Sequence, residues 1–170
     1  MRRHPALFAI LVGGGIAGAF DITYAVVYSS FRGVEAMRVL QSVASGLLGS
    51  AAFEGGAPIA ALGFVLHFML SFLWATIFFV ASRWFPVMVR RAVPCGLAFG
   101  LLVYLSMTFV VLPLSAYPLK ITFSPDRVAL NLFVHMVLFG LSIALATRAA
   151  SSGKSAVTPV PLRISATAGR

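Results

Sequence analysis

Charged side chains are scarce in this chain, and acidic ones are the scarcest. Aspartate, glutamate, lysine and arginine together make up 10% of the 170 residues, whereas a soluble domain typically contains about 25%. Four acidic residues face thirteen basic ones, which gives a net charge of +9. Because 60% of the residues are hydrophobic, the shortage of charge excludes an ordinary soluble domain and predicts a membrane protein.

Cysteine and enzyme motifs are nearly or wholly missing as well. Cys95 is the single cysteine, so an intrachain disulfide is excluded, and its apolar surroundings favour an inert thiol. The sequence contains no Gly-x-Ser-x-Gly, phosphate-loop or dinucleotide motif, which favours a non-enzymatic protein. The basic surplus does not indicate nucleic acid, because the basic residues flank apolar stretches, where they set orientation and attract anionic lipid headgroups.

Long apolar runs are what the chain has in abundance. A bilayer core of about 30 Å needs roughly 20 apolar residues in a helix, and four segments meet this requirement. A fifth segment, 39–53, is short and rich in small residues, which is more typical of an interfacial or re-entrant helix. We therefore predict an all-α polytopic membrane protein, a four-helix bundle with one extra short helix. The predicted spans are about 5–29, 57–82, 92–112 and 128–147.

The basic residues predict how these spans are oriented. With four spans and the N-terminus inside, nine lysines and arginines lie on the cytoplasmic side and four lie outside, as the positive-inside rule expects. Five spans with the N-terminus outside give the same division, so segment length decides in favour of four. We expect residues 1–148 to form one membrane domain with both termini in the cytoplasm. Residues 149–170, rich in Ser, Ala, Thr and Pro, are expected to form a flexible cytoplasmic tail.

The second and fourth spans share a pattern. The pattern Ala-Leu-x-x-x-Leu-His-Phe-Met-Leu of residues 61–70 recurs as Ala-Leu-x-x-x-Val-His-Met-Val-Leu in residues 129–138, with His67 and His135 at equivalent positions. An imidazole in hydrocarbon is costly and therefore usually has a role. Two of them at matching points of matching helices are the most specific functional indication in this chain.

The first and third spans carry a matching pair of glycines, Gly14-x-x-x-Gly18 and Gly96-x-x-x-Gly100. The glycine pairs are 82 residues apart and the histidines 68, and the difference of 14 is about the length of the short helix. Both offsets are explained by a 2+2 parallel repeat, that is, two copies of a helical hairpin that run in the same direction. The first copy then has an insertion in its outer loop. The alternative is a chance match, since such glycine spacing is common in membrane helices and serves close packing.

Polar residues of all four spans are predicted to lie at one depth. At 1.5 Å per residue, Asp21, His67 and His135 lie roughly 12, 15 and 11 Å below the outer ends of their spans. Polar groups at such a depth are expected to face the bundle interior and to pair with one another. The predicted polar layer consists of Asp21, Tyr24, His67, Tyr104, Asn131 and His135.

Several functions are compatible with this layer. The favoured one is a hydrogen-bonded core that fixes helix register in an accessory subunit or a small standalone bundle, with the lipid bilayer and a membrane protein or a second copy of the chain as partners. An alternative is a b-type haem electron carrier ligated by His67 and His135. Another is a proton-linked small-solute transporter in which Asp21 and the histidines titrate. A metal bound by the same three residues lacks any supporting local spacing.

Five stretches of the chain resemble a known group of proteins. Together they resemble a widespread uncharacterised family of bacterial inner-membrane proteins with four predicted spans and, more distantly, the YagU-like group. The resemblance covers about Ala9 to Arg148 and implies a multi-pass protein of the bacterial inner membrane, without implying a reaction. Many members of the family carry an amide near the position of Thr108. The stretches that carry the resemblance are residues 20–25, 40–49, 52–56, 66–68 and 110–116.

Overall fold

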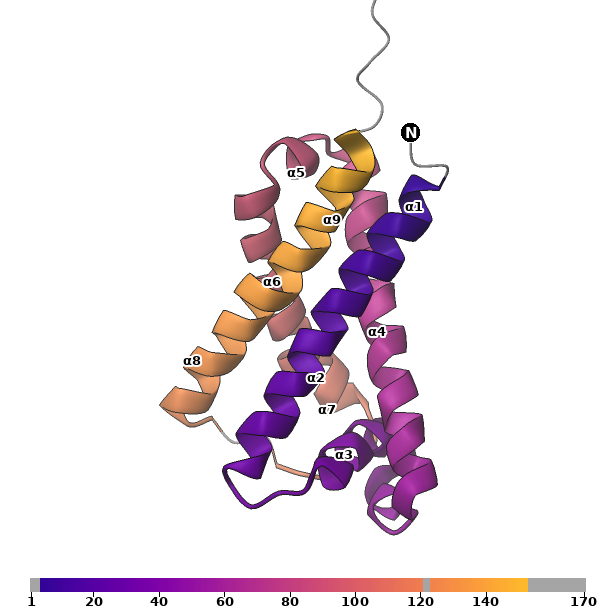
Figure 1. Cartoon of the computed structure of the whole chain (residues 1–170). Helices are drawn as coiled ribbons and strands as arrows, with labels where there is room; N and C mark the ends of the chain where they lie inside the picture. Colours follow the sequence, from indigo (N-terminus) through magenta and orange to yellow (C-terminus); the bar gives the residue numbers. More distant parts are fainter. Residues whose placement is uncertain (1–3, 121–122, 153–170) are drawn as a thin grey trace, which may run out of the picture.

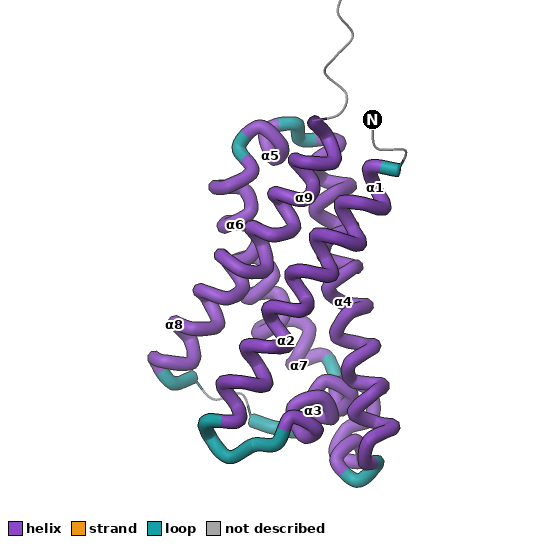
Figure 2. Tube along the Cα trace, viewed as in Figure 1, coloured by secondary structure: helices purple, strands orange, loops and turns teal. Residues whose placement is uncertain are grey.

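The computed structural model of the chain describes residues 4–120 and 123–152. In these residues every regular element is helical, and four long rods stand side by side (Figures 1 and 2). Each rod is long and apolar enough to cross a membrane. The predicted all-α fold with four spanning helices is therefore confirmed. The rods run over Pro5–Ser30, Gly56–Trp84, Ala92–Leu114 and Pro125–Ser151.

The four rods differ in how regular they are. Three of them contain a π-helical segment, in which hydrogen bonds join residues five apart and the turn is wider than in an α-helix. Only the second rod is α-helical throughout. The first rod comprises α1 (Pro5–Phe8), η1 (Ala9–Gly13) and α2 (Gly14–Ser30); the second is α4 (Gly56–Trp84); the third comprises α6 (Ala92–Ser106), η3 (Met107–Val111) and α7 (Leu112–Leu114); the fourth comprises α8 (Pro125–Phe133), η4 (Val134–Gly140) and α9 (Leu141–Ser151).

The first rod ends in a glycine turn. Gly33 has a φ of +77°, a left-handed conformation that a residue without a Cβ adopts at little cost. Its N–H donates to the carbonyl of Ser30 and that of Val34 to the carbonyl of Ser29, both at 3.0 Å. This pair of bonds is the Schellman motif, which satisfies the last carbonyls of the helix and redirects the chain.

Rods four and two begin with proline in the first helical turn, where its missing N–H costs no hydrogen bond. Pro125 opens α8, and Pro58 lies in the first turn of α4. The second and third rods are joined at the other end of the bundle by the short helix α5 (Val87–Arg90). Consecutive rods lie antiparallel (Figure 1).

The short segment predicted at 39–53 is helical and starts slightly earlier. It forms α3 (Ala36–Leu48), followed by a 3-10 turn, η2 (Gly49–Phe53). Figure 1 shows α3 at one end of the bundle, beside the start of α4. A Cβ at Gly63 of α4 would overlap the carbonyl of Leu40, so a glycine is required where the two helices touch. Gln41 is buried there, and its Nε2 donates to the carbonyl of Gly56 at 3.2 Å.

Each hairpin is held together by its glycine pair. A Cβ at Gly18 of the first rod would meet the side chains of Phe68 and Ser71 of the second, whereas a Cβ at Gly100 of the third would overlap the backbone of His135 and Met136 of the fourth. A Cβ at Gly14 would meet Phe72, and one at Gly96 would meet Ala144 and Gly140. Phe68 and Met136 follow the two histidines directly, but one contact is made by a side chain and the other by the backbone. The 2+2 parallel repeat stays a prediction.

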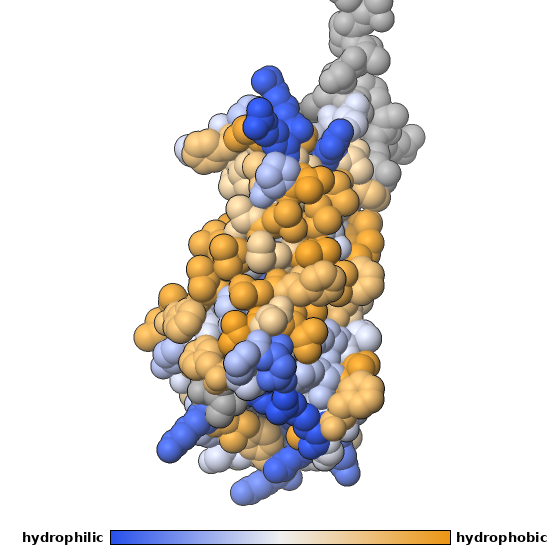
Figure 3. Space-filling view, turned by 90° about the vertical axis from the view of Figure 1, so that its left-hand side faces the viewer, coloured by the Kyte–Doolittle hydropathy of each residue, from blue (hydrophilic) through white to orange (hydrophobic). Residues whose placement is uncertain are grey.

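The surface of the bundle is divided into an apolar middle and charged ends (Figure 3). Large apolar side chains that are exposed on the rods, such as Leu11, Met69, Leu73, Leu102 and Val110, belong to the middle region and suit contact with lipid tails. The chain is thus an integral membrane protein. The start of α1 and the end of α9 lie at the same end, which we call the inner end; α3 and the start of α8 lie at the outer end (Figure 1).

The predicted tail is only partly covered by the structure. Helix α9 continues to Ser151, so the first residues of the segment 149–170 are helical. The remainder of that segment, 153–170, lies outside the described residues.

Candidate functional site

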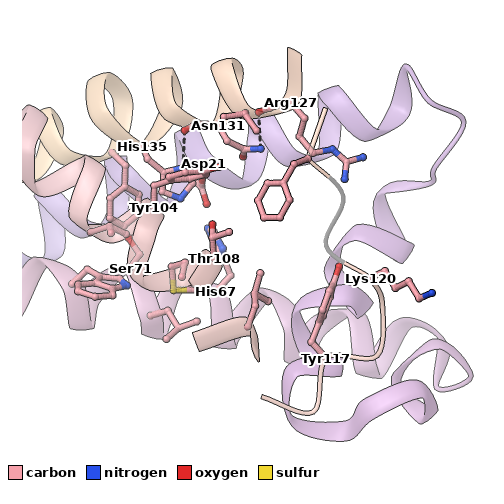
Figure 4. Close-up of a pocket in the computed structure, with 18 residues that line it drawn as sticks. Asp21, His67, Ser71, Tyr104, Thr108, Tyr117, Lys120, Arg127, Asn131 and His135 are labelled. Carbon is pink, nitrogen blue, oxygen red and sulfur yellow. Dashed lines mark hydrogen bonds and ion pairs between the residues drawn. The ribbon is translucent and has the colours of Figure 1, made fainter. Parts of the chain in front are cut away.

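A cavity of about 300 Å³ lies between the rods in the outer half of the bundle. It exists because the glycine contacts hold the rods close in the inner half, whereas Figure 1 shows them spreading apart toward the outer end. All four rods and the segment after α7 contribute to its lining. Its polar lining residues, labelled in Figure 4, are Asp21, His67, Ser71, Tyr104, Thr108, Tyr117, Lys120, Arg127, Asn131 and His135.

The floor of the cavity is formed around Asp21 and His135. The Nδ1 atom of His135 lies 3.9 Å from Oδ1 of Asp21, which is an electrostatic contact and too long for a hydrogen bond. Nδ1 bonds instead to the carbonyl of Asn131 at 2.9 Å. A carbonyl can only accept, so Nδ1 carries the proton, and Nε2 of a neutral His135 is an acceptor. The edge of Tyr104 packs against the imidazole, with ring centroids 5.7 Å apart.

His67 lines the same cavity, but its imidazole makes a different hydrogen bond from that of His135. Its Nε2 lies 2.9 Å from the carbonyl of Gly18 and must donate to it, which leaves Nδ1 as the acceptor of a neutral ring. One turn further along α4, the buried hydroxyl of Ser71 donates to the carbonyl of Gly14 at 2.6 Å. His67 and Ser71 thus tie the second rod to the first at both glycines of the first rod's pair.

The two histidines differ because their helices differ. His67 lies in a regular stretch of α4, whereas His135 lies in the π-helical segment η4. In a π-helical turn the amide of residue 135 is not directed at the carbonyl of residue 131, which leaves that carbonyl to the imidazole. The sequence repeat predicts equivalent positions for the two rings, and both rings do line the cavity, but their hydrogen bonds are not equivalent.

Three further residues surround the outer part of the cavity: Tyr117, Lys120 and Arg127. Burial raises the pKa of the Tyr117 hydroxyl, so this phenol remains a neutral donor at physiological pH. The backbone carbonyl of Arg127 accepts a hydrogen bond from Nδ2 of Asn131 at 2.9 Å. The polar layer inside the membrane is therefore continuous with a cationic region at the outer end (Figure 4).

A group of contacts beside the cavity links the first rod to the fourth. Asp126 accepts hydrogen bonds from the hydroxyl of Tyr28 at 2.8 Å and from Nη2 of Arg32 at 2.6 Å. The guanidinium of Arg32 also lies over the Tyr28 ring, 4.8 Å from its centroid. These side chains fix the start of α8 against the end of α2. They place Arg127, the next residue, at the cavity.

Most of the predicted polar layer is brought together by the fold. Asp21, His67, Tyr104, Asn131 and His135 all line the cavity. Tyr24 is not among the lining residues: its ring lies 5.6 Å from that of Tyr28, and its buried hydroxyl makes no hydrogen bond within the described residues. Three residues after Asp21, a side chain is rotated by about 60° from the Asp21 direction, which is enough to turn Tyr24 away.

The predicted polar layer does not include Thr108, Tyr117, Lys120 or Arg127, which also line the cavity. Thr108 is buried and lines the cavity, although the family resemblance drew attention only to an amide near this position. For Lys120 and Arg127 an indication was present in the charge pattern. They are two of the four basic residues on the side that the positive-inside rule leaves sparse.

The geometry does not fit a haem held by His67 and His135. The cavity volume is at the lower limit of the range of about 300–1,000 Å³ that is typical of ligand pockets, and Nε2 of His67 is already bonded to Gly18. A Soret band lost in both His67→Ala and His135→Ala would contradict this conclusion. Within residues 4–120 and 123–152, no three His, Cys, Asp or Glu side chains are close enough together to hold a metal ion.

No known protein family, curated protein or solved structure matches the chain.

Proposed function

We propose that this chain is a non-enzymatic protein of the bacterial inner membrane that binds a small solute, from the outer side, in the cavity between its four rods. The observation that carries the proposal is the cavity itself. It is lined by polar groups of every rod at the depth where polar groups in hydrocarbon are costly. A bundle that needed polar contacts only to fix helix register would pair these groups with one another and close around them.

The inner half of the bundle supports binding from one side. Below the cavity, the core consists of closely packed apolar residues with exposed fractions of a few per cent or less, including Ala17, Phe78, Ile143 and Ala144. Close packing of this kind leaves no passage for water or a solute toward the inner end. A solute that reaches Asp21 therefore arrives from the outer end, past Tyr117 and Arg127.

A second candidate is proton-linked transport, which the contact between Asp21 and His135 favours. Two ionisable groups 3.9 Å apart at the floor of a solute site suit a relay that couples protonation to solute binding. Transport also requires the packed inner half to open. Flux of a bound solute in vesicles that is lost in Asp21→Asn favours this candidate, while binding without flux leaves the first function in place.

Thiol accessibility tests the proposed function. In a Cys95→Ser background, Thr108→Cys is expected to react with a membrane-impermeant thiol reagent added outside intact cells stripped of their outer membrane. Ala144→Cys, in the packed core, is the matched control and is expected to stay unreactive. Val87→Cys, exposed at the inner end, is expected to react only after the membrane is opened. A Thr108→Cys variant that is unreactive from outside would contradict the proposal.

The inner-membrane location, the cytoplasmic termini and the likeness to the four-span family belong to the same proposal. The basic residues Arg83, Arg90, Arg91 and Arg148 lie at the inner end, as cytoplasmic ends require. An accessory-subunit role is compatible with solute binding. Native mass measurement after gentle detergent extraction tests it: a partner or second copy favours a subunit, and a monomer favours a standalone protein.

A further inference from the structure

Exposed arginines gather at the inner end of the bundle. Arg83 lies in the last turn of α4, Arg90 and Arg91 at the end of α5, and Arg148 in the last turn of α9. Within residues 4–120 and 123–152, the side chains of these four arginines make no hydrogen bond or ion pair. Because α5 packs against both α4 and α9, the fold brings three arginine-bearing segments to one end (Figures 1 and 3).

The acidic side chains of the protein all lie in the other half of the bundle. Asp21 lines the cavity, Glu35 precedes α3, Glu54 follows η2, and Asp126 lies in the first turn of α8. None of these positions is near the inner end (Figure 1). The inner arginines are therefore available to an anion from outside the chain. At a membrane surface the abundant anion is the lipid phosphate, which a guanidinium binds through paired N–H donors.

A shallow apolar groove of about 400 Å³ lies on α4 at the same end. Apart from the indole of Trp84, its one polar side-chain group is the hydroxyl of Thr76, which donates to the carbonyl of Phe72 at 2.7 Å. The groove therefore suits a hydrocarbon chain. The residues that line it are Thr76, Ile77, Val80, Ala81, Trp84 and Phe85.

This groove runs in the direction of lipid tails. Thr76 and Trp84 are eight residues apart in α4, or about 12 Å along the helix axis at 1.5 Å per residue. Trp84 is 80% exposed and Phe85 61%, and aromatic side chains at the end of a span typically lie at headgroup level. Arg83 borders the groove, because a side chain three residues after Val80 is rotated from it by about 60°. The groove thus extends from a cation at headgroup level into the apolar part of the bilayer.

The turn after α4 brings two more arginines to the same end of the groove. The backbone N–H of Arg90 donates to the carbonyl of Pro86 at 3.1 Å, and that of Arg91 to the carbonyl of Val87 at 2.8 Å. Pro86 directly follows Phe85, so the backbone of Arg90 lies one helical turn from the groove. A long arginine side chain can cover that distance while its guanidinium stays among the headgroups.

We propose that the inner end binds one anionic phospholipid, with an acyl chain in the groove of α4 and the phosphate at Arg83, Arg90 and Arg91. This lipid site is separate from the cavity and does not depend on the proposed function. A phosphatidylcholine offers the same acyl chain, but its choline cation is repelled by the arginines. A free phosphate carries the negative charge but has no chain to fill the groove. The combination of groove and arginines therefore selects an anionic lipid.

Native mass spectrometry of the full chain in detergent tests the proposal. The probes are phosphatidylglycerol and phosphatidylcholine with identical acyl chains, and inorganic phosphate serves as a competitor. We expect the first phosphatidylglycerol to bind at least about tenfold more tightly than phosphatidylcholine, from the attraction of several arginines. Inorganic phosphate is expected not to displace it, because the acyl chain contributes to binding.

Substitutions of the arginines locate the headgroup. Arg83→Gln is expected to weaken phosphatidylglycerol binding by about fivefold, and the double substitution Arg90→Gln with Arg91→Gln by about twenty-fivefold. Arg83→Lys keeps the charge and should keep most of the affinity. Lys120→Gln is the matched control, since it removes a positive charge at an exposed position of the outer end, and it is expected to leave binding unchanged.

Substitutions of apolar residues locate the acyl chain. Val80→Phe places a larger side chain in the groove and is expected to weaken the binding of both lipids. Leu102→Phe, exposed on the third rod, is the control and should bind phosphatidylglycerol as the unmodified chain does.

Several results would overturn the proposal. Equal affinity for the two lipids would remove the role of charge, and displacement of phosphatidylglycerol by inorganic phosphate would indicate a site for free phosphate. A preference for phosphatidylglycerol that survives the arginine substitutions, or is lost in Lys120→Gln, would place the lipid elsewhere. Unchanged phosphatidylglycerol binding in Val80→Phe would show that the headgroup binds without the groove.

Discussion

The inner and outer halves of this bundle differ in what lies between the rods. In the inner half, glycines and alanines let the backbones touch, and apolar side chains fill the remaining space. In the outer half the rods separate, and polar side chains from all four surround a cavity. Lipid supplies little hydrophobic force between helices, so close contact has to come from small residues. Where those residues are missing, the space between rods becomes available for a ligand.

The largest effect is expected from adding bulk to the packed half. A Cβ at Gly140 would overlap backbone atoms of Gly96 and Gly100, so Gly140→Val has to push the third and fourth rods apart. We expect it to lower the free energy of unfolding by about 3 kcal/mol, measured by denaturation in mixed micelles. Gly15→Ala is the control, since a Cβ at Gly15 meets nothing within 4 Å. Equal effects of the two substitutions would contradict the close packing of the inner half.

A smaller effect is expected at the boundary between the halves. His67→Phe removes the hydrogen bond to the Gly18 carbonyl that joins the first two rods, and should cost about 1 kcal/mol, typical of interhelical bonds in membranes. His135→Phe removes a bond within a single rod. The free energy of unfolding should therefore change less in His135→Phe than in His67→Phe, measured by the same denaturation. A larger change in His135→Phe would show that the contact between Asp21 and His135 stabilises the bundle more than the bond from His67 does.

Adding bulk to the outer half should change stability even less. Thr108 lines the cavity, so the larger side chain of Thr108→Phe has space to enter, and we expect the free energy of unfolding to change by no more than about 1 kcal/mol. Binding of a small solute in the cavity should nevertheless be lost, as followed by the fluorescence of Trp74, which also lines the cavity. Leu105→Phe, on the exposed side of the same helix, is the control and should retain binding. Retained binding in Thr108→Phe would place the solute elsewhere.

The smallest effect is expected at the outer surface. Asp126→Asn breaks the ion pair with Arg32. The side chain of Arg32 is 46% exposed and that of Asp126 is 51% exposed. Exposed pairs of this kind contribute little and are screened by salt. We expect a slightly lower melting temperature at low ionic strength and no difference from the unmodified chain at high ionic strength. A large decrease that persists in salt would show that the contacts of Asp126 hold the outer half together.

The four rods and the depth of their polar residues in the membrane were predictable from the sequence, because both depend on position along a helix. Apolar stretches of sufficient length indicate the spans, and the rise per residue places Asp21, His67 and His135 at one level. The direction in which a side chain points around the helix axis was harder to predict, as Tyr24 shows. Its depth suits the polar layer, but it packs against Tyr28 instead of lining the cavity.

The outer part of the site could not be predicted because it depends on how far the rods spread. Whether Tyr117 and Lys120 reach the cavity depends on the path of the chain between α7 and α8, which no local pattern determines. Arg127 is placed by Asp126, whose partners Tyr28 and Arg32 are more than 90 residues away in sequence. The different roles of the two histidines likewise require knowledge of the π-helical segment η4.

The π-helical segments also make the site sensitive to chain length. Two of them, η3 and η4, carry Thr108 and His135 to the cavity. If one residue were removed from such a segment, the chain would return to ordinary helical winding. Because a π-helical turn holds about one residue more than an α-helical turn, the side chains beyond the segment would keep their directions, whereas side chains within it would move around the axis by up to about 100°. A single deletion would thus change which side chain of the segment faces the cavity while preserving the rod on either side of it.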